Sequence, residues 1–282
     1  MPEPQRDRPR IRFMSVDQPI STKTLIGHPD EPLVIEEMRT GNRVERRRIV
    51  NPERSYQVPT FVFWNETVTP TQQQLVREAM NELFQEIGFD RNMIQFLGNW
   101  REEKYRDANG QLTPHKSIEW QVKSKRNPNK KQINASDLLY AMFNDPYQIR
   151  TPHWEIVITN EDMYTPDTNF VIGLAQDDLG TVISLKRLEA ITNPQARREV
   201  QKTEVYHEVS HVLGLPTGRR GRNNLEHSLG PHCKSPGCSM KQGLSVPNDW
   251  ITFTTERLRQ GGKPLCKECL EDLRQKFHLT KR

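Results

Sequence analysis

The sequence predicts an α+β domain with a mixed β-sheet, preceded by an N-terminal extension. Three observations favour this fold class. Short apolar runs typical of buried strands alternate with amphipathic helical segments between residues 60 and 214. One predicted helix near the end of this region carries an HExxH pattern. Beyond that helix the chain is poor in apolar residues and holds all four cysteines, which favours an irregular C-terminal part.

Residues 1–58 are predicted to form a basic, partly irregular extension that packs in part on the domain. Proline, arginine and glutamate dominate this region, and its apolar periodicity is weak. The N-terminus shows no apolar core of a secretory signal, and no apolar run is long enough to cross a membrane. With a mean hydropathy of −0.82, we expect a soluble, cytoplasmic protein.

The domain is predicted to open with a strand over residues 60–64. Thr69-Pro-Thr-Gln72 then has the form of a capping box with proline at the first helical position, and the helix that follows ends at Gly88. Its apolar residues recur at helical spacing and predict one buried face. Further strands are predicted over residues 93–97, 118–122, 154–159, 170–175 and 181–185, and helices over residues 135–143, 249–260 and 266–276.

The helix with the HExxH pattern is predicted to start at Asn193, with Pro194 as its first residue. His207 and His211 are four residues apart and therefore lie on one face, where both imidazoles can reach one metal ion. Glu208 is rotated by about 100° and can instead reach a water bound to that ion. Two ligands beside a free carboxylate indicate a hydrolytic zinc site. The alternative is a solvated helix face without a metal.

A third ligand is expected after the helix ends. Gly214 and Pro216 stop the helix one turn after His211, which frees the chain to bring in another side chain. Three residues beyond Gly214, where the strict HExxHxxGxxH pattern has its third histidine, the chain has Thr217, which is not a zinc ligand. The third ligand must therefore come from further along the chain.

The spacing of histidine, cysteine and methionine beyond the helix resembles that of the archaemetzincins, a family of metzincin zinc peptidases. The residues that carry the resemblance are His207, Glu208, His211, His232, Cys233, Cys238, Met240, Cys266 and Cys269. Residues 158–164, 170–175 and 183–188 also look like the strands and loops that precede the zinc helix in that family. The resemblance covers residues 59–282 and implies a metzincin-like domain. Residues 59–214 would be its N-terminal subdomain with the active-site helix, and residues 215–282 a zinc-binding C-terminal subdomain.

The resemblance also implies two zinc ions per chain. His207, His211 and His232 would bind the catalytic zinc, and Glu208 would be the general base. Met240 would form the Met-turn beneath that site. A second, structural zinc would staple the C-terminal subdomain, held by Cys233, Cys238, Cys266 and Cys269. The implied activity is that of a zinc metallopeptidase acting on a peptide or protein substrate.

Two insertions interrupt the family pattern. Eighteen residues separate Gly214 from Cys233, which is about 15 more than the family pattern has. Another 25 residues separate Met240 from the next cysteine, where the family has about 17. The first insertion contains His227, a competing candidate for the third ligand. We favour His232, because a histidine adjacent to a cysteine joins the two zinc sites and keeps the family spacing from cysteine to methionine.

Other interpretations of the sequence remain open beside the peptidase. A net charge of +5 and a pI near 9.0 are only mildly basic, and the basic runs at residues 46–48, 123–131 and 219–222 are typical of solvated loops. The alternative function is a zinc-knuckle module that binds nucleic acid through these runs. Glu208 argues against it, because a structural metal site has no use for a free carboxylate. An enzyme for a non-peptide amide, or a peptidase closed by residues 215–231, also fits.

The four cysteines could form either a zinc site or two disulfides. Paired short spacings in a reducing compartment indicate a four-cysteine zinc site. The alternative is two disulfides in an exported protein, and the missing secretory signal argues against it. No membrane partner is expected, and a nucleic-acid partner is disfavoured by the mild charge.

Overall fold

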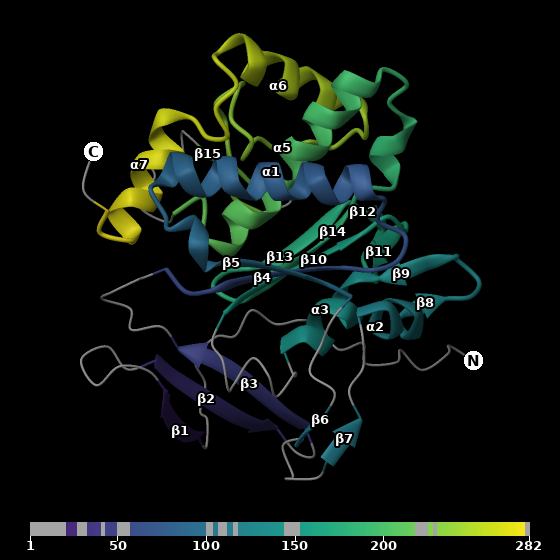
Figure 1. Ribbon diagram of the computed structural model, residues 1–282, viewed down its shortest axis with the longest axis vertical. Coiled ribbons are helices and arrows are strands. Elements are labelled where there is room, and N and C mark those ends of the chain that lie inside the picture. Colours follow the sequence, from purple (N-terminus) through teal and green to yellow (C-terminus); the bar gives the residue numbers. More distant parts are fainter. Residues whose placement is uncertain are drawn as a thin grey trace, which may run out of the picture.

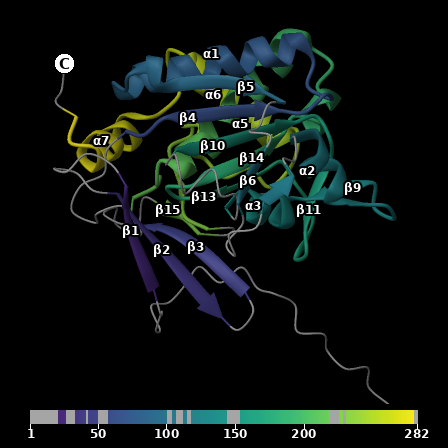
Figure 2. The same ribbon diagram turned by 60° about the horizontal axis from the view of Figure 1, so that its bottom comes forward.

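The computed structural model describes residues 57–99, 118–143, 153–217, 225–227 and 230–279, and the backbone of residues 21–26, 33–40, 43–49, 104–106 and 112–114. At its centre is a mixed five-stranded sheet in the order β13-β14-β10-β4-β5, which can be followed across Figure 2. The strands are β4 (Thr60–Trp64), β5 (Ile94–Gly98), β10 (Trp154–Thr159), β13 (Gly173–Gln176) and β14 (Gly180–Ser184). Four of them are parallel, and β13 runs antiparallel to β14 at one edge. The mixed sheet with helices confirms the predicted fold class.

Helices cover both faces of this sheet (Figure 1). Successive side chains of a strand point to opposite faces, so each face has its own apolar core. Ile156 and Ile158 of β10 lie in the core beneath α1 (Pro70–Ile87) and α5 (Pro194–Val212). Val157 lies in the core shared with α2 (Ile118–Ser124) and α3 (Ala135–Phe143). Because both faces are covered, β10 is buried along its whole length, including Glu155 and Thr159.

Helix α1 begins and ends where its sequence predicts. The Thr69 side chain accepts a hydrogen bond from the Gln72 amide, and the Gln72 side chain accepts one from the Thr69 amide at 2.9 Å, so the capping box is complete. Gly88 ends the helix with φ at +101°, a left-handed conformation that favours glycine. The buried face consists of Gln72, Leu75, Val76, Ala79, Met80, Leu83, Phe84 and Ile87.

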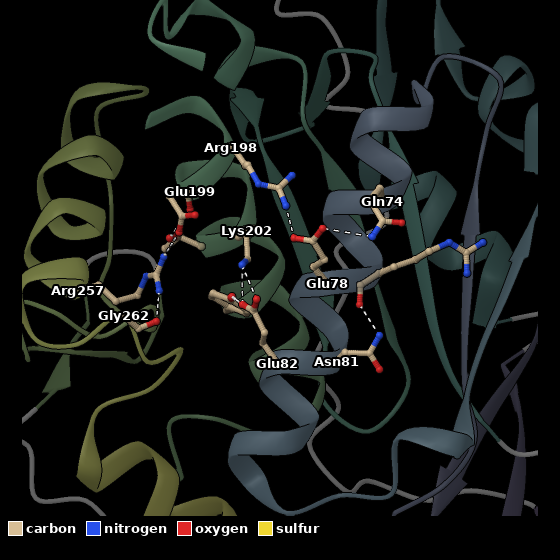
Figure 3. A network of polar contacts seen from close by, with 12 residues as sticks. Gln74, Glu78, Asn81, Glu82, Arg198, Glu199, Lys202, Arg257 and Gly262 are labelled. Atoms are coloured by element: carbon tan, nitrogen blue, oxygen red, sulfur yellow. Dashed lines mark hydrogen bonds and ion pairs between the residues drawn. The ribbon is translucent and has the colours of Figure 1, made fainter. Parts of the chain in front are cut away.

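Polar contacts fix α5 against α1 and α6 (Asn248–Arg259), as Figure 3 shows. Lys202 of α5 lies 2.6 Å from the Glu82 carboxylate of α1, and the Tyr206 hydroxyl donates to the same carboxylate. From α6, the buried Arg257 pairs with Glu199 of α5 at 3.0 Å. A charged arginine this deeply buried needs such a partner to offset its desolvation. The helix with the HExxH pattern is therefore held in place by contacts with two neighbouring helices.

Two predicted strands were wrong. Residues 118–122 form the start of α2, because Ile118 and Val122, four residues apart, are buried on one helix face while Trp120 between them is 44% exposed. The predicted strand over residues 170–175 is split between two sheets. β12 (Thr168–Val171) belongs to a four-stranded sheet with β11 (Met163–Thr165), β9 (Gln132–Asn134) and β8 (Arg126–Asn127), and β13 belongs to the central sheet. Ile172 separates β12 from β13 and is buried in a third apolar cluster.

The N-terminal extension contains more regular structure than predicted. Strands β1 (Ser21–Ile26), β2 (Leu33–Thr40) and β3 (Arg43–Ile49) form an antiparallel sheet. Its backbone register places Glu36 opposite Arg47 and Glu37 opposite Arg46. The prediction rested on composition and weak apolar periodicity, and neither indicates these strands. The rest of residues 1–56 lies outside the described part of the chain.

The remaining elements follow the sequence closely. The predictions for residues 60–64, 135–143 and 154–159 are confirmed, and those for residues 93–97, 181–185 and 249–260 are confirmed to within one residue. Helix α7 spans Lys267–Lys276, and Cys266 is its N-cap. The short elements are η1 (Arg91–Met93), η2 (Arg187–Ala190), and the hairpin of β6 (Lys104–Arg106) and β7 (Leu112–Pro114). Among the described residues, no helix has the length and apolar character needed to cross a membrane.

Candidate metal centre

Helix α5 carries the HExxH residues in the second half of its length. The Asn193 side chain caps its start by accepting from the Ala196 amide at 2.9 Å, and Pro194 is its first residue, both as predicted. The helix ends at Val212, and Gly214 turns the chain away with φ at +88°. This early stop leaves His211 within the last turn of the helix, where the following segment can approach it.

Three imidazoles converge beside this helix end. Nε2 of His211 lies 3.2 Å from Nε2 of His207 and 3.2 Å from Nε2 of His232. A tetrahedral zinc with Zn–N bonds of about 2.0–2.1 Å holds its nitrogen ligands roughly 3.3 Å apart, so this spacing fits one ion. The competing candidate, His227, is exposed and does not belong to the group of three.

A backbone carbonyl orients each of the three rings. The pairs are His207 Nδ1 with the Ser239 carbonyl at 2.7 Å, His211 Nδ1 with the Leu215 carbonyl at 2.8 Å, and His232 Nδ1 with the Gly230 carbonyl at 3.1 Å. A carbonyl oxygen can only accept, so each Nδ1 carries the hydrogen and each Nε2 presents a lone pair. The lone pairs of the three Nε2 atoms repel one another, and a cation bound between them would be attracted to all three. Metal-ligating histidines are commonly oriented in this way.

The three rings are also in the neutral form that a metal requires. Burial and the neighbouring His211 and His232 hold the pKa of His207 well below its ordinary value. Burial and His232 lower the pKa of His211 to about 4. Burial likewise lowers the pKa of His232. At neutral pH no proton therefore has to be displaced from the three Nε2 atoms before a metal binds.

Glu208 lies beside this group and not within it. Its carboxylate is buried between α5 and the edge of the central sheet, where Thr181 Oγ1 approaches one oxygen at 3.5 Å. Gly173 of β13 makes room for it, because a Cβ at that position would overlap the carboxyl group. Burial raises the pKa of Glu208 to about 8. A cation held by the histidines would lower that pKa again, because a positive charge favours the carboxylate.

Two further residues next to the site escaped the sequence analysis. Trp250 of α6 packs edge-on against His207, with 5.3 Å between the ring centroids. Glu204 is fully buried one turn before Glu208, and neither of its carboxyl oxygens has a hydrogen-bond partner among the described residues. Burial, and then the charge of Glu208, raise the pKa of Glu204 well above its ordinary value. The four-residue spacing of the two glutamates was the available signal, because it places both carboxyls on one side of the helix.

The four cysteines form a second cluster. Their sulfur atoms all lie within 4.8 Å of one another, with Cys233 Sγ 3.8 Å from Cys266 Sγ and Cys238 Sγ 3.5 Å from Cys269 Sγ. A tetrahedral zinc with Zn–S bonds of about 2.3 Å places its sulfurs roughly 3.8 Å apart. No pair is close to the S–S bond length of about 2.05 Å, and none of the four forms a disulfide. This geometry favours the four-cysteine metal site over two disulfides.

Part of the first insertion supports the third histidine. β15 (Leu225–Glu226) pairs antiparallel with β16 (His232–Cys233), so that Glu226 lies opposite His232. Met240, the predicted Met-turn residue, is fully buried, and its carbonyl accepts from the Cys233 amide at 2.8 Å. Residues 218–224 and 228–229, with the basic run at 219–222, lie outside the described residues. The alternative that residues 215–231 close the site therefore stays a hypothesis.

The chain is similar to known archaemetzincins in part of its sequence and in its fold. No model of a known protein family matches the chain. Over 95 residues, 32% of its length, the chain is 37% identical to archaemetzincin of Pyrococcus horikoshii, and the match spans 43% of that protein, less than half of it. The crystal structure of archaemetzincin from Methanopyrus kandleri aligns with a TM-score of 0.51 and 18% identity, over 79% of this chain and 96% of that one. A zinc-dependent peptidase from Methanocorpusculum labreanum aligns with a TM-score of 0.48 and 19% identity, over 76% of this chain and 99% of that one.

Two of these proteins resemble the chain in different ways, one in sequence and one in fold. The Pyrococcus horikoshii protein is similar in sequence over the matched region, and the Methanopyrus kandleri protein is similar in fold over most of both chains. In the sequence of the matched region and in its fold, the chain is archaemetzincin-like.

Proposed function

We propose that this chain is a zinc-dependent peptidase whose active centre is formed by His207, His211, His232 and Glu208. The observation that carries the proposal is the arrangement of the three Nε2 atoms, each aimed inward by a backbone carbonyl, beside a buried carboxylate that is not a ligand. Neutral imidazoles suit zinc, whereas calcium and magnesium sites are built from oxygen ligands. The sequence similarity to the archaemetzincin of Pyrococcus horikoshii over the matched region supports the same class of reaction.

A zinc ion bound here would supply a water of lowered pKa and would polarise the carbonyl of the peptide bond. The three neutral imidazoles would hold the ion without cancelling its charge. Glu208 accepts a proton from the attacking water at its carboxylate and passes it to the leaving amine nitrogen. Its position between α5 and β13 excludes bulk water, and the missing side chain of Gly173 fixes how close the carboxylate can lie to the sheet edge.

The proposal includes a second zinc at the four cysteines. These come from β16, from the segment before Met240, and from the start of α7, so one ion would join three parts of the C-terminal region. A structural zinc contributes on the order of 10 kcal/mol in small peptides, which is large beside the stability of a typical domain. It would add to the contacts by which Met240, Leu265 and Leu273 join this region to the main apolar core.

The test separates chemistry from metal binding. Zinc-loaded wild-type protein, Glu208→Gln and a matched control, Glu256→Gln at a half-buried position of α6 where the carboxylate contacts Arg259 and Gln260, are incubated with a broad mixture of peptides. The new termini are identified by mass spectrometry. The amide cannot accept the proton, so Glu208→Gln should cleave about 10²–10⁴-fold more slowly. All three proteins should carry equal zinc, and the control should cleave at the wild-type rate. Equal cleavage by wild type and Glu208→Gln, or no cleavage by either, contradicts the proposal.

A further inference from the structure

Two of the three candidate zinc histidines depend on the cysteine cluster for their position. His232 directly precedes Cys233, so the backbone that places that sulfur also places the ring. His207 donates through Nδ1 to the carbonyl of Ser239, and Ser239 directly follows Cys238. Two of the four cysteines are thus adjacent to a group that builds the histidine site. The sequence motif shows the first adjacency, and only the structure reveals the second.

The third histidine does not share this dependence. His211 donates to the carbonyl of Leu215, which lies directly beyond the end of its own helix. That segment is anchored in the main apolar core, where Leu213 and Leu215 are buried. His211 therefore keeps its orientation through contacts that involve no cysteine. One ring is therefore positioned by α5 and the segment directly after it, and the other two need the cysteine-bearing loop.

The loop from residue 233 to residue 240 is held by contacts to the sulfurs and by a few backbone bonds, one of which runs from the Ser239 amide to the Pro264 carbonyl at 3.3 Å, two residues before Cys266. The amide of Ser235 donates to Cys233 Sγ at 3.4 Å, and the amide of Cys266 donates to Cys238 Sγ at 3.4 Å. Two backbone bonds close the loop on itself, from Cys233 to the Met240 carbonyl at 2.8 Å and from Cys238 to the Ser235 carbonyl at 3.2 Å. Apart from the cysteines, Met240 is the only apolar side chain between residues 233 and 240 that is large enough to anchor the loop.

We propose that metal at the cysteine cluster sets the affinity of the histidine site for zinc. With the cluster filled, the loop is fixed, and both the His232 ring and the Ser239 carbonyl are in place before zinc arrives. With the cluster empty, four closely spaced thiol groups lose their common partner, and the loop no longer holds these two groups against α5. Loss of an orienting partner typically costs 10–100-fold in metal affinity. The inference rests on the two zinc sites proposed above, and it makes the cysteine cluster a positioning element for the reaction.

The first test removes one sulfur without touching the loop. Cys269 lies in α7, remote in sequence from every histidine of the site, and Cys269→Ser prevents a tetrahedral four-sulfur site. Leu273→Ala is the matched control, because it removes a fully buried side chain from the same helix and no sulfur. Cys269→His is the rescue, since three cysteines and one histidine also form a closed zinc site. Zinc affinity at the histidines is measured by competition with a chelator, and the protonation of each ring by ¹⁵N NMR.

The expected result is a loss of about 10–100-fold in zinc affinity at the histidines of Cys269→Ser, and near wild-type affinity in the control and the rescue. In the same spectra, His207 and His232 should lose their fixed Nδ1–H form while His211 keeps it. General destabilisation would disturb all three rings alike. Wild-type zinc affinity in Cys269→Ser, with its cluster shown to be empty, overturns the proposal.

If Cys269→Ser does not fold, the coupling can be tested in the other direction, by measuring metal affinity at the cysteines in a variant of the histidine site. Coupling between two sites acts equally in both directions. His211→Ala disables the histidine site and leaves the cluster intact, so it should weaken cobalt binding at the cysteines by the same factor, measured from thiolate-to-cobalt charge-transfer absorption under chelator competition. Unchanged cobalt affinity overturns the coupling alone. Failure of the loaded wild-type protein to hold any metal at the histidines would instead contradict the proposed function.

Discussion

A single methyl group at Gly173 should separate catalysis from stability. Gly173 lies in the edge strand β13, with its Cα facing the Glu208 carboxylate, and its backbone does not adopt a left-handed conformation that would strain alanine. An ideal Cβ built at this position overlaps the carboxyl carbon, one carboxyl oxygen and the Cγ of Glu208. Gly173→Ala therefore perturbs the proposed base and none of the proposed metal ligands.

The size of the effect follows from the overlap. Ordinary contact between carbon atoms needs about 3.5–4.0 Å, so the carboxylate must move by on the order of 1 Å to admit the methyl group. The displaced group is the end of a flexible side chain, so the cost in folding stability should be small. A misplacement of about 1 Å in a catalytic group can cost on the order of 10²-fold in rate. We expect kcat to fall by about that factor, with zinc content and melting temperature close to wild type.

The assay is the cleavage rate of a peptide identified in the digestion experiment, measured with metal content and thermal unfolding on the same samples. Glu208→Asp is the internal control, because it shortens the side chain by one carbon–carbon bond, about 1.5 Å, and makes room for the methyl group. The double variant should therefore lose less activity than the two single variants multiplied together. Wild-type turnover in Gly173→Ala, or fully multiplicative losses in the double variant, would refute the placement of Glu208 against β13.

Three further outcomes are expected. His232→Ala should lose the catalytic zinc, whereas His227→Ala, altered at an exposed ring outside the group, should keep it, as metal analysis can show. The folded protein lowers the pKa of His211 from 6.5 to about 4, so the free energy of unfolding of the metal-free protein should fall by about 3 kcal/mol as the pH falls through that window. His211→Ala should lose that part of the pH dependence in chemical unfolding. Burial raises the pKa of Glu204 above its unfolded value of 4.5, so the free energy of unfolding should fall as the pH rises beyond 4.5. Glu204→Gln should therefore be more stable than wild type at pH 8 but not at pH 4.

The parts of the fold with local sequence signals were predictable. The capping box at Thr69, the cap at Asn193 and the stop at Gly214 are each determined by a few neighbouring residues, and the structure has all three. The segment at residues 118–122 shows the limit of such signals. Its alternating apolar residues fit a strand, and only packing against the sheet decides that Trp120 stays outside.

The candidate site likewise contains some residues that local sequence patterns predict and others that only the fold brings together. The four-residue spacing predicts that His207 and His211 share a helix face, and the structure shows it. The convergence of His232 with them across 21 residues came from family resemblance, because an insertion removes the third ligand from its usual place. Trp250 and the Ser239 carbonyl reach His207 from distant parts of the chain, so no local pattern could indicate them.

Zinc anomalous diffraction from crystals of the zinc-loaded protein tests the central claim most directly. The claim is that one zinc ion, held by three histidines, places a water beside Glu208. The account predicts one peak about 2.0–2.1 Å from the Nε2 atoms of His207, His211 and His232, with a bound water within about 2.6–3.2 Å of the Glu208 carboxylate. A second peak should lie about 2.3 Å from the four cysteine sulfurs. A peak at the cysteines alone, or a zinc ligated directly by Glu208, would contradict the account.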